Sequence, residues 1–168
     1  AGTIIELTDN LSLTSNTPVS VKTLNLNDKT ITLGSETTDL IVSDAITLDG
    51  PDEQIHTQSA DLTLNGLLSV DNGGLYSSDG TLEFGDGLNQ TGGELEIDNS
   101  TLRLNADLIK TGGTLQTSGT SITVLSNLNI TSNNAISAKT VELGDSRLSL
   151  SSDTSDLVLS DSLSLQDT

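Results

Sequence analysis

The sequence predicts an all-β fold, a right-handed parallel β-solenoid of about eight triangular coils, with roughly 20 residues and three short strands in each coil. Two observations predict it. Pairs of apolar residues separated by one residue recur at near-regular intervals along the whole chain, and Gly, Asn and Asp separate the short apolar segments. Residues 1–168 form a single expected domain, because no linker or shift in composition divides the chain.

The apolar pairs occur nine times, and most follow one another by about one coil, with a single short interval between Ile46 and Leu62. Only 33% of the residues are apolar, so apolar residues at all eighteen positions cannot be chance. We expect these side chains to form two continuous columns inside the solenoid. The expected structural core is Ile5, Leu7, Leu24, Leu26, Ile46, Leu48, Leu62, Leu64, Leu82, Phe84, Leu102, Leu104, Ile122, Val124, Val141, Leu143, Leu163 and Leu165.

Residues 101–120 illustrate one coil, with apolar segments that begin at Leu102, Leu108 and Leu115. Apolar and polar residues alternate in the first segment, which is the period of a strand with one buried face. Asn105 follows this segment, and the turn 111–113 (Thr-Gly-Gly) follows the second. Equivalent strands of successive coils must pair in parallel to satisfy their backbone groups, and right-handed winding is the strong default.

A longer repeat overlies the coils. Residues 3–50 align without a gap with residues 120–167, and 20 of the 48 positions are identical. We interpret the offset between these two segments as six coils. Neither end carries a polar capping element, so we expect either a chain that continues on both sides or copies that stack end to end.

The composition limits the kinds of partner that the protein can bind. Twenty-four acidic and six basic residues give a net charge of −18, which disfavours nucleic acid and anionic membranes, and no apolar run reaches membrane-spanning length. Stacked carboxylates repel one another unless salt screens them or cations bridge them, so loosely bound Ca²⁺ would suit this surface. Otherwise the acidic coat serves solubility alone. The absence of Cys and Met is compatible with an extracellular location.

Candidate sites are few. The alignment of the coils makes the third one shorter than its neighbours, with residues 50–53 in place of its second strand. Asp49, Asp52, Glu53 and His56 gather there and are weak candidates for a metal site, because their spacing matches neither a calcium loop nor a zinc pattern. An acidic surface kink is the interpretation that we prefer for these residues. We predict no catalytic residues, no cofactor and no enzyme activity, since acids, bases and substrate-binding cations do not cluster.

Short Leu-x-Leu strands, Asn/Asp/Gly corners, T-G-G-x-L turns and an acidic, Cys-free composition resemble the β-helical shafts of large bacterial surface proteins. Filamentous haemagglutinin-like adhesins, autotransporter passengers and fibre-forming matrix proteins are of this type. The resemblance covers the whole chain but brings no functional residue with it. It implies an extracellular or cell-surface stalk, adhesin shaft or filament subunit of bacterial origin.

Two classes of function therefore stay open. The first is a structural rod whose partner is itself, through end-to-end stacking or as part of a longer chain. The second is a binding module for a glycan, a cation or ice. Rows of outward threonines bind ice in some solenoids, but Glu83 and Arg103 interrupt the outward surface here. A polysaccharide lyase or hydrolase is the least expected function.

Overall fold

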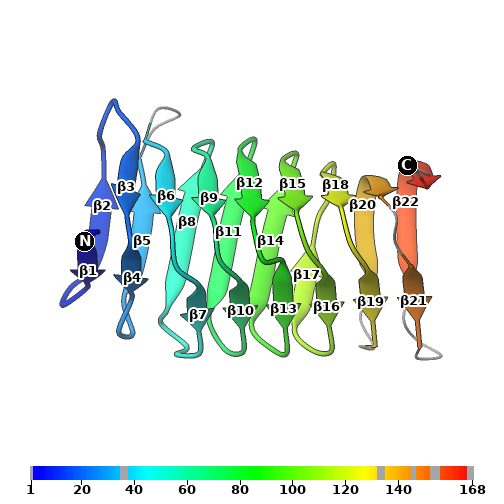
Figure 1. Ribbon diagram of the computed structural model, residues 1–168, viewed down its shortest axis with the longest axis horizontal. Coiled ribbons are helices and arrows are strands. Elements are labelled where there is room, and N and C mark those ends of the chain that lie inside the picture. The colour runs from blue at the N-terminus through cyan, green and yellow to red at the C-terminus, as the bar shows by residue number, and fades with distance from the viewer. Residues whose placement is uncertain (1, 35–37, 132–134, 145–146, 152–155, 166–168) are drawn as a thin grey trace.

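A computed structural model of the chain describes residues 2–34, 38–131, 135–144, 147–151 and 156–165. These residues form strands, turns and irregular connections and include no helix. The strands stack into a straight rod of about eight coils with the two termini towards opposite ends (Figure 1). The predicted β-solenoid is confirmed.

Three flat faces, named A, B and C here, run along the rod. Face A consists of a two-stranded sheet and a six-stranded sheet: β1 (Ile4–Glu6) and β4 (Thr23–Asn25), then β7 (Ile46–Leu48), β10 (Leu68–Val70), β13 (Leu88–Gln90), β16 (Leu108–Lys110), β19 (Leu128–Ile130) and β21 (Leu148–Leu150). Face B contains β2 (Leu11–Leu13), β5 (Thr30–Leu33), β8 (Gln54–Gln58), β11 (Gly74–Ser78), β14 (Glu94–Asp98) and β17 (Thr114–Gln116). Face C contains β3 (Val19–Val21), β6 (Leu40–Val42), β9 (Leu62–Leu64), β12 (Thr81–Phe84), β15 (Thr101–Leu104), β18 (Ser121–Val124), β20 (Ile136–Leu143) and β22 (Leu157–Leu165).

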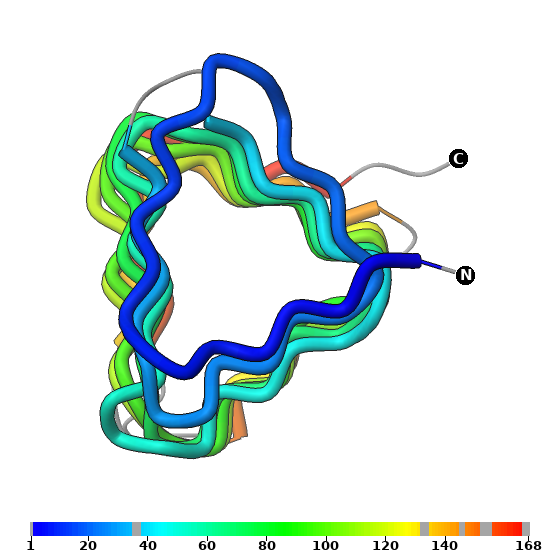
Figure 2. Tube along the Cα trace, turned by 90° about the vertical axis from the view of Figure 1, so that its left-hand side faces the viewer, coloured from blue at the N-terminus to red at the C-terminus, as the bar shows by residue number. Residues whose placement is uncertain are grey.

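The strands pair in parallel throughout the described chain, each with its equivalent in the next coil. Figure 2 views the rod from its N-terminal end and shows a triangular cross-section. The chain runs clockwise as it recedes from the viewer, so the winding is right-handed (Figure 2). This hand agrees with the strong preference of parallel strand connections.

Alternation along each strand sends every second side chain into the triangle. In β15, Leu102 and Leu104 are fully buried, whereas Thr101 and Arg103, before and between them, are exposed. Stacking then brings like residues together, since Leu102 lies between Leu82 and Ile122 in the pairing. Burying such a side chain contributes roughly 1.5–3 kcal/mol, so the stacked columns supply most of the stabilisation.

The corner between faces B and C depends on residues that tolerate a left-handed backbone. Asp79, Asn99 and Gly119 occupy equivalent places in three successive coils and have φ angles of 64°, 50° and 68°. Asn, Asp and Gly adopt this conformation at little cost. The next residue in two of these corners, Ser100 or Thr120, is buried, and Thr120 Oγ1 donates to the carbonyl oxygen of Ile97 at 2.5 Å.

The register of the apolar pairs differs from the prediction. Ile46 pairs with Leu68 on face A, and Leu62 pairs with Leu40 on face C. The first three predicted pairs thus lie on face A and the pairs from Leu62 onward lie on face C, so the two continuous columns that we expected are wrong. The short interval between Ile46 and Leu62 marks the change of face.

The third coil is not short, which corrects a second expectation. Across this coil, Ile46 pairs with Leu68 and Leu40 pairs with Leu62. Both sequence intervals are longer than the interval between the paired residues Leu62 and Leu82 in the next coil. Residues 50–53 do not replace a strand, because β8 follows them directly. The corner between β7 and β8 contains residues 49–53, whereas the corner between β10 and β11 contains only residues 71–73.

Most of the expected core residues are buried in this arrangement. Ile5 is partly buried and packs against the core. Leu163 and Leu165, in the last described strand, are 45% and 68% exposed, which differs from the expectation. Their inward-facing positions lie on β22, which pairs with β20 on one side only among the described strands.

The offset between the two copies of the longer repeat does not correspond to a whole number of coils. In the alignment of the two copies, β1 corresponds to β18, which is the seventeenth strand after β1 in the described chain. A strand of face A therefore corresponds to a strand of face C. Likewise, β2 of face B corresponds to β19 of face A. Eighteen strands would make six coils, so the interpretation as six coils needs this correction.

Two polar side chains occupy the interior of face A, where the neighbouring coils hold Val70 and Ile130. Lys110 is fully buried, and its ammonium donates to the carbonyl oxygens of Gly112 and Gly113 at 2.8 and 2.7 Å. Gln90 Nε2 donates to the carbonyl oxygen of Thr114 at 2.7 Å. Both side chains therefore bind the backbone in or beside the Gly-Gly turn, and burial lowers the pKa of Lys110.

Candidate functional site

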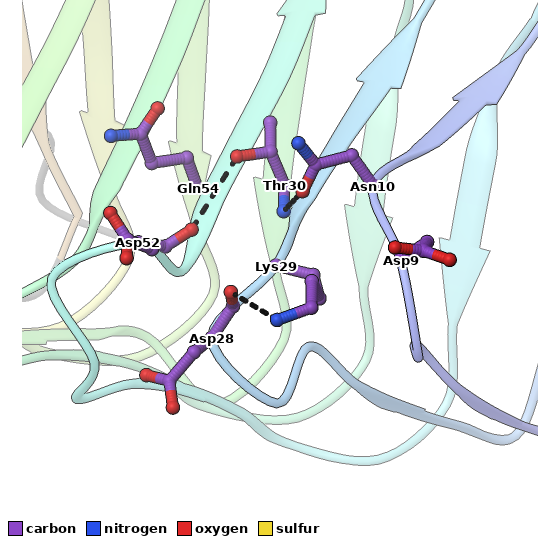
Figure 3. A pocket seen from close by; sticks show the side chains of 7 residues that line it. All are labelled: Asp9, Asn10, Asp28, Lys29, Thr30, Asp52 and Gln54. Carbon is purple, nitrogen blue, oxygen red and sulfur yellow. Dashed lines mark hydrogen bonds between the residues drawn. The ribbon is translucent and has the colours of Figure 1, made fainter.

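A hollow lies at the corner between faces A and B in the first three coils. It encloses about 570 Å³ and is lined by Asp9, Asn10, Asp28, Lys29, Thr30, Asp52 and Gln54. We name it the acidic corner. Figure 3 shows that its side chains come from three successive coils and surround Lys29. Each coil thus contributes one aspartate to the same corner of the rod.

Hydrogen bonds between coils shape the acidic corner. The backbone N–H of Thr30 donates to Asn10 Oδ1 at 2.9 Å, and Thr30 Oγ1 donates to the carbonyl oxygen of Asp52 at 3.4 Å (Figure 3). Lys29 Nζ donates to the carbonyl oxygen of Asp28 at 3.1 Å. Lys29 thus lines the same corner as the three aspartates, and its ammonium bonds to a backbone oxygen there.

This geometry suits weak attraction of hydrated cations better than direct coordination. Carboxylates in successive coils are separated by about one strand spacing, roughly 4.8 Å, at the backbone. The described residues contain no group of three or more His, Cys, Asp or Glu side chains placed to hold a metal ion. Calcium bound by diffuse charge, as the sequence suggested, stays a prediction.

Glu53, one of the four predicted metal candidates, has a structural role. It is only 7% exposed, and its Oε2 accepts from the backbone N–H groups of Asp49 and Gly50 at 2.8 and 3.0 Å. Its Oε1 accepts from the N–H of Asp28 at 3.4 Å, in the previous coil. Burial alone would raise the pKa of Glu53, but the backbone N–H groups of Gly50, Asp49 and Asp28 together lower it below its ordinary value.

We predict that Glu53→Gln lowers the free energy of unfolding by about 1–3 kcal/mol at pH 7, because charge-assisted bonds to backbone N–H groups are lost. A lowered folded pKa stabilises the fold above the ordinary pKa of 4.5, and this stabilisation disappears as pH falls through the folded pKa. The difference between parent and variant in urea denaturation should therefore shrink in acid. Asp52→Asn, an exposed change in the same corner, is the control, and equal losses in both variants would contradict this role.

The other candidates do not meet at one point. Asp49 and Asp52 are exposed in the corner that precedes β8, whereas His56 lies on the outer surface of β8. His56 Nε2 bonds to Gln54 Oε1 at 3.0 Å, and its ring stacks on that of Tyr76 in the next coil. Burial lowers the pKa of His56. The structure thus places Asp49, Asp52 and Glu53 in the corner that precedes β8, and His56 on face B.

Comparisons of the chain with protein-family models, curated proteins and solved structures give no match. The structure establishes the fold of this protein, a parallel β-solenoid of about eight coils. The described part of the chain also contains no helix with the length and hydropathy that a membrane crossing requires.

Sequence reasoning missed Asp9, Asp28 and Tyr76 as neighbours of the predicted residues. The corner before β8 is longer than its neighbours, so a fixed interval did not align Asp28 with Asp52. His56 and Tyr76, in contrast, are one regular coil apart and face each other in the register of β8 and β11. That regular interval is the signal that could have found this pair.

Proposed function

We propose that this protein is a structural rod of an extracellular bacterial assembly, either a segment of an adhesin shaft or a filament subunit that joins end to end. The observation that carries the proposal is the stacking of parallel strands, coil upon coil, on three faces along the rod (Figure 1). A core of stacked columns gives stiffness and defined length, which are the properties that a shaft requires. The acidic, Cys-free composition is compatible with this location.

The ends of the rod support joining to a further coil. A strand at the end of a parallel sheet has unpaired N–H and C=O groups that can extend onto another strand. On β22, Leu163 and Leu165 also expose apolar surface. Head-to-tail contact between these different ends would not close into a ring, so it gives open filaments.

The lateral faces favour end-to-end over sideways contact. A net charge of −18 on a chain of this size makes parallel rods repel one another at low salt. The ends, in contrast, offer backbone pairing along three faces at once. If the chain is part of a longer one, the next coil would pair with the same end strands.

Electron microscopy and sedimentation of the purified 168-residue segment test the proposal. We expect rods at low concentration and longer filaments of the same width as concentration rises. The double variant Leu163→Lys/Leu165→Lys should shorten the filaments, whereas Thr47→Lys/Thr81→Lys, which adds the same charge on exposed lateral positions, should leave them unchanged. Globular particles, or filaments shortened equally by both double variants, would contradict it.

A further inference from the structure

Two Asn-Gly dipeptides lie in successive corners of the rod, Asn65–Gly66 between β9 and β10 and Asn72–Gly73 between β10 and β11. Asparagine before glycine is especially prone to deamidation, because the backbone nitrogen of glycine can attack the side-chain amide without hindrance from a side chain of its own. Both asparagines are exposed and both glycines are buried, so exposure does not distinguish the two corners. Their hydrogen bonds do.

The second corner, residues 71–73, is held by a single carbonyl group. The backbone N–H groups of Asp71, Asn72 and Gly73 all donate to the carbonyl oxygen of Leu48, at 3.0, 3.2 and 3.2 Å. The nitrogen of Gly73, which would attack the side chain of Asn72, therefore already has a partner in the preceding coil. This corner must open locally before it can react.

The first corner leaves the corresponding nitrogen without a partner. Within the described part of the chain, the N–H of Gly66 donates no hydrogen bond, and the side chain of Asn65 makes none. Other atoms hold this corner in place, since the N–H of Asn65 donates to the carbonyl oxygen of Val42 at 2.9 Å and the carbonyl oxygen of Gly66 accepts from the N–H of Asp86 at 3.3 Å. The attacking nitrogen and the amide that it attacks thus lie next to each other, and neither must break a hydrogen bond first.

We propose that Asn65 is a site of spontaneous covalent modification in the folded protein, whereas Asn72 is protected. The nitrogen of Gly66 forms a bond to Cγ of Asn65, the bond from Cγ to Nδ2 breaks, and ammonia leaves with the proton that the Gly66 nitrogen gives up. Water then opens the cyclic imide at either of its two carbonyl groups, which yields aspartate or isoaspartate. Water is the only co-reactant, and nothing is oxidised or reduced.

Isoaspartate adds one carbon to the backbone of a closely stacked corner. A Cβ built on Gly85, in the next coil, would lie 2.2 Å from the carbonyl oxygen of Asn65, so the two backbones leave no spare room between them. A longer backbone at residue 65 must therefore displace the neighbouring coil or the bond to Val42. The reaction would create a weak point within the rod that grows with the age of the protein.

Incubation of the whole folded chain at neutral pH, in water labelled with heavy oxygen, tests the proposal. Cleavage before aspartate separates residues 61–70 from residues 71–78, so mass spectrometry measures label at Asn65 and at Asn72 independently. We expect Asn65 to react about tenfold faster than Asn72, which corresponds to about 1.4 kcal/mol in activation free energy. In urea, where both corners unfold, the two rates should agree within about twofold.

Asn65→Gln should abolish the rapid release of ammonia, because its longer side chain forms the larger ring far more slowly, and Asn72→Gln is the matched control that should retain it. Circular dichroism verifies that both variants are folded. Equal rates at the two asparagines in the folded chain, a faster reaction at Asn72, or no reaction at Asn65 while the unfolded chain reacts would overturn the proposal.

Asn65→Asp separates the effect of the added charge from that of the added carbon. The aged parent protein, enriched in isoaspartate at residue 65, should unfold at a lower urea concentration than fresh Asn65→Asp. Equal midpoints would contradict the weak point that we infer at this corner.

Discussion

Replacing Leu102 or Leu104 with Asp is expected to abolish cooperative folding. Both side chains are fully buried and stack between equivalent residues of two neighbouring coils. An unpaired charge at such a position costs several kcal/mol, against a total stability of about 5–15 kcal/mol for a typical domain. Circular dichroism during thermal and urea denaturation measures the loss.

Arg103→Asp is the matched control because Arg103 lies between the two leucines on β15 and is exposed. It introduces the same side chain into the same strand but on the outer surface, so we expect a change below about 1 kcal/mol. If Leu102→Asp melted cooperatively near the parent temperature, the inward orientation of this strand would be wrong.

Gly113→Ala is expected to lower the free energy of unfolding by about 2–5 kcal/mol, through backbone strain and overpacking together. Gly113 has a φ of 65°, where a Cβ costs about 1–2 kcal/mol. That Cβ would also lie 2.1 Å from the carbonyl oxygen of Gly92, in the backbone of the neighbouring coil. Backbone cannot rotate away as a side chain can, so overpacking adds about 1–3 kcal/mol.

Gly144→Ala is the control for this change. A Cβ at Gly144 would meet its nearest neighbour, Leu125 Cα, at 3.5 Å, which is an ordinary contact. We expect a difference within about 1 kcal/mol of the parent, in either direction. Urea denaturation of both variants under one set of conditions makes the comparison. Equal effects would show that the turn of residues 111–113 relaxes without cost.

The fold was predictable because its signals are local. Alternation in segments such as residues 102–104 defines strands, and Gly-Gly or Asn between segments defines corners. The face to which a segment belongs was not predictable from spacing alone. Ile46–Leu48 on face A and Leu62–Leu64 on face C have the same apolar pattern, and only the pairing partners distinguish them.

For the buried Lys110, the residue type and the alternation along the strand predict opposite orientations. Lysine is almost never fully buried, so average preferences place Lys110 at the surface. Alternation in β16 instead places Leu108 and Lys110 inside and Ile109 outside, and the structure has this pattern, with Ile109 37% exposed. Carbonyl groups of the adjacent Gly-Gly turn satisfy the ammonium, which explains how the interior tolerates it.

The candidate sites depended on register more than on residue type. Asp49, Asp52, Glu53 and His56 are close in sequence, which favoured a common site. In a solenoid, however, a residue's neighbours on the surface are those about one coil away, so His56 contacts Tyr76 and Glu53 reaches Asp28. Neighbours along one strand point alternately inward and outward and do not converge.

The longer repeat places similar segments on different sides of the rod. Since residues 3–50 and 120–167 are related by seventeen strands rather than eighteen, the second copy is turned by one third of a revolution about the rod axis. Similar segments therefore look out in different directions: β2 faces the side of face B and β19 the side of face A. A partner that recognised one such segment would therefore meet its copy on a different side of the rod.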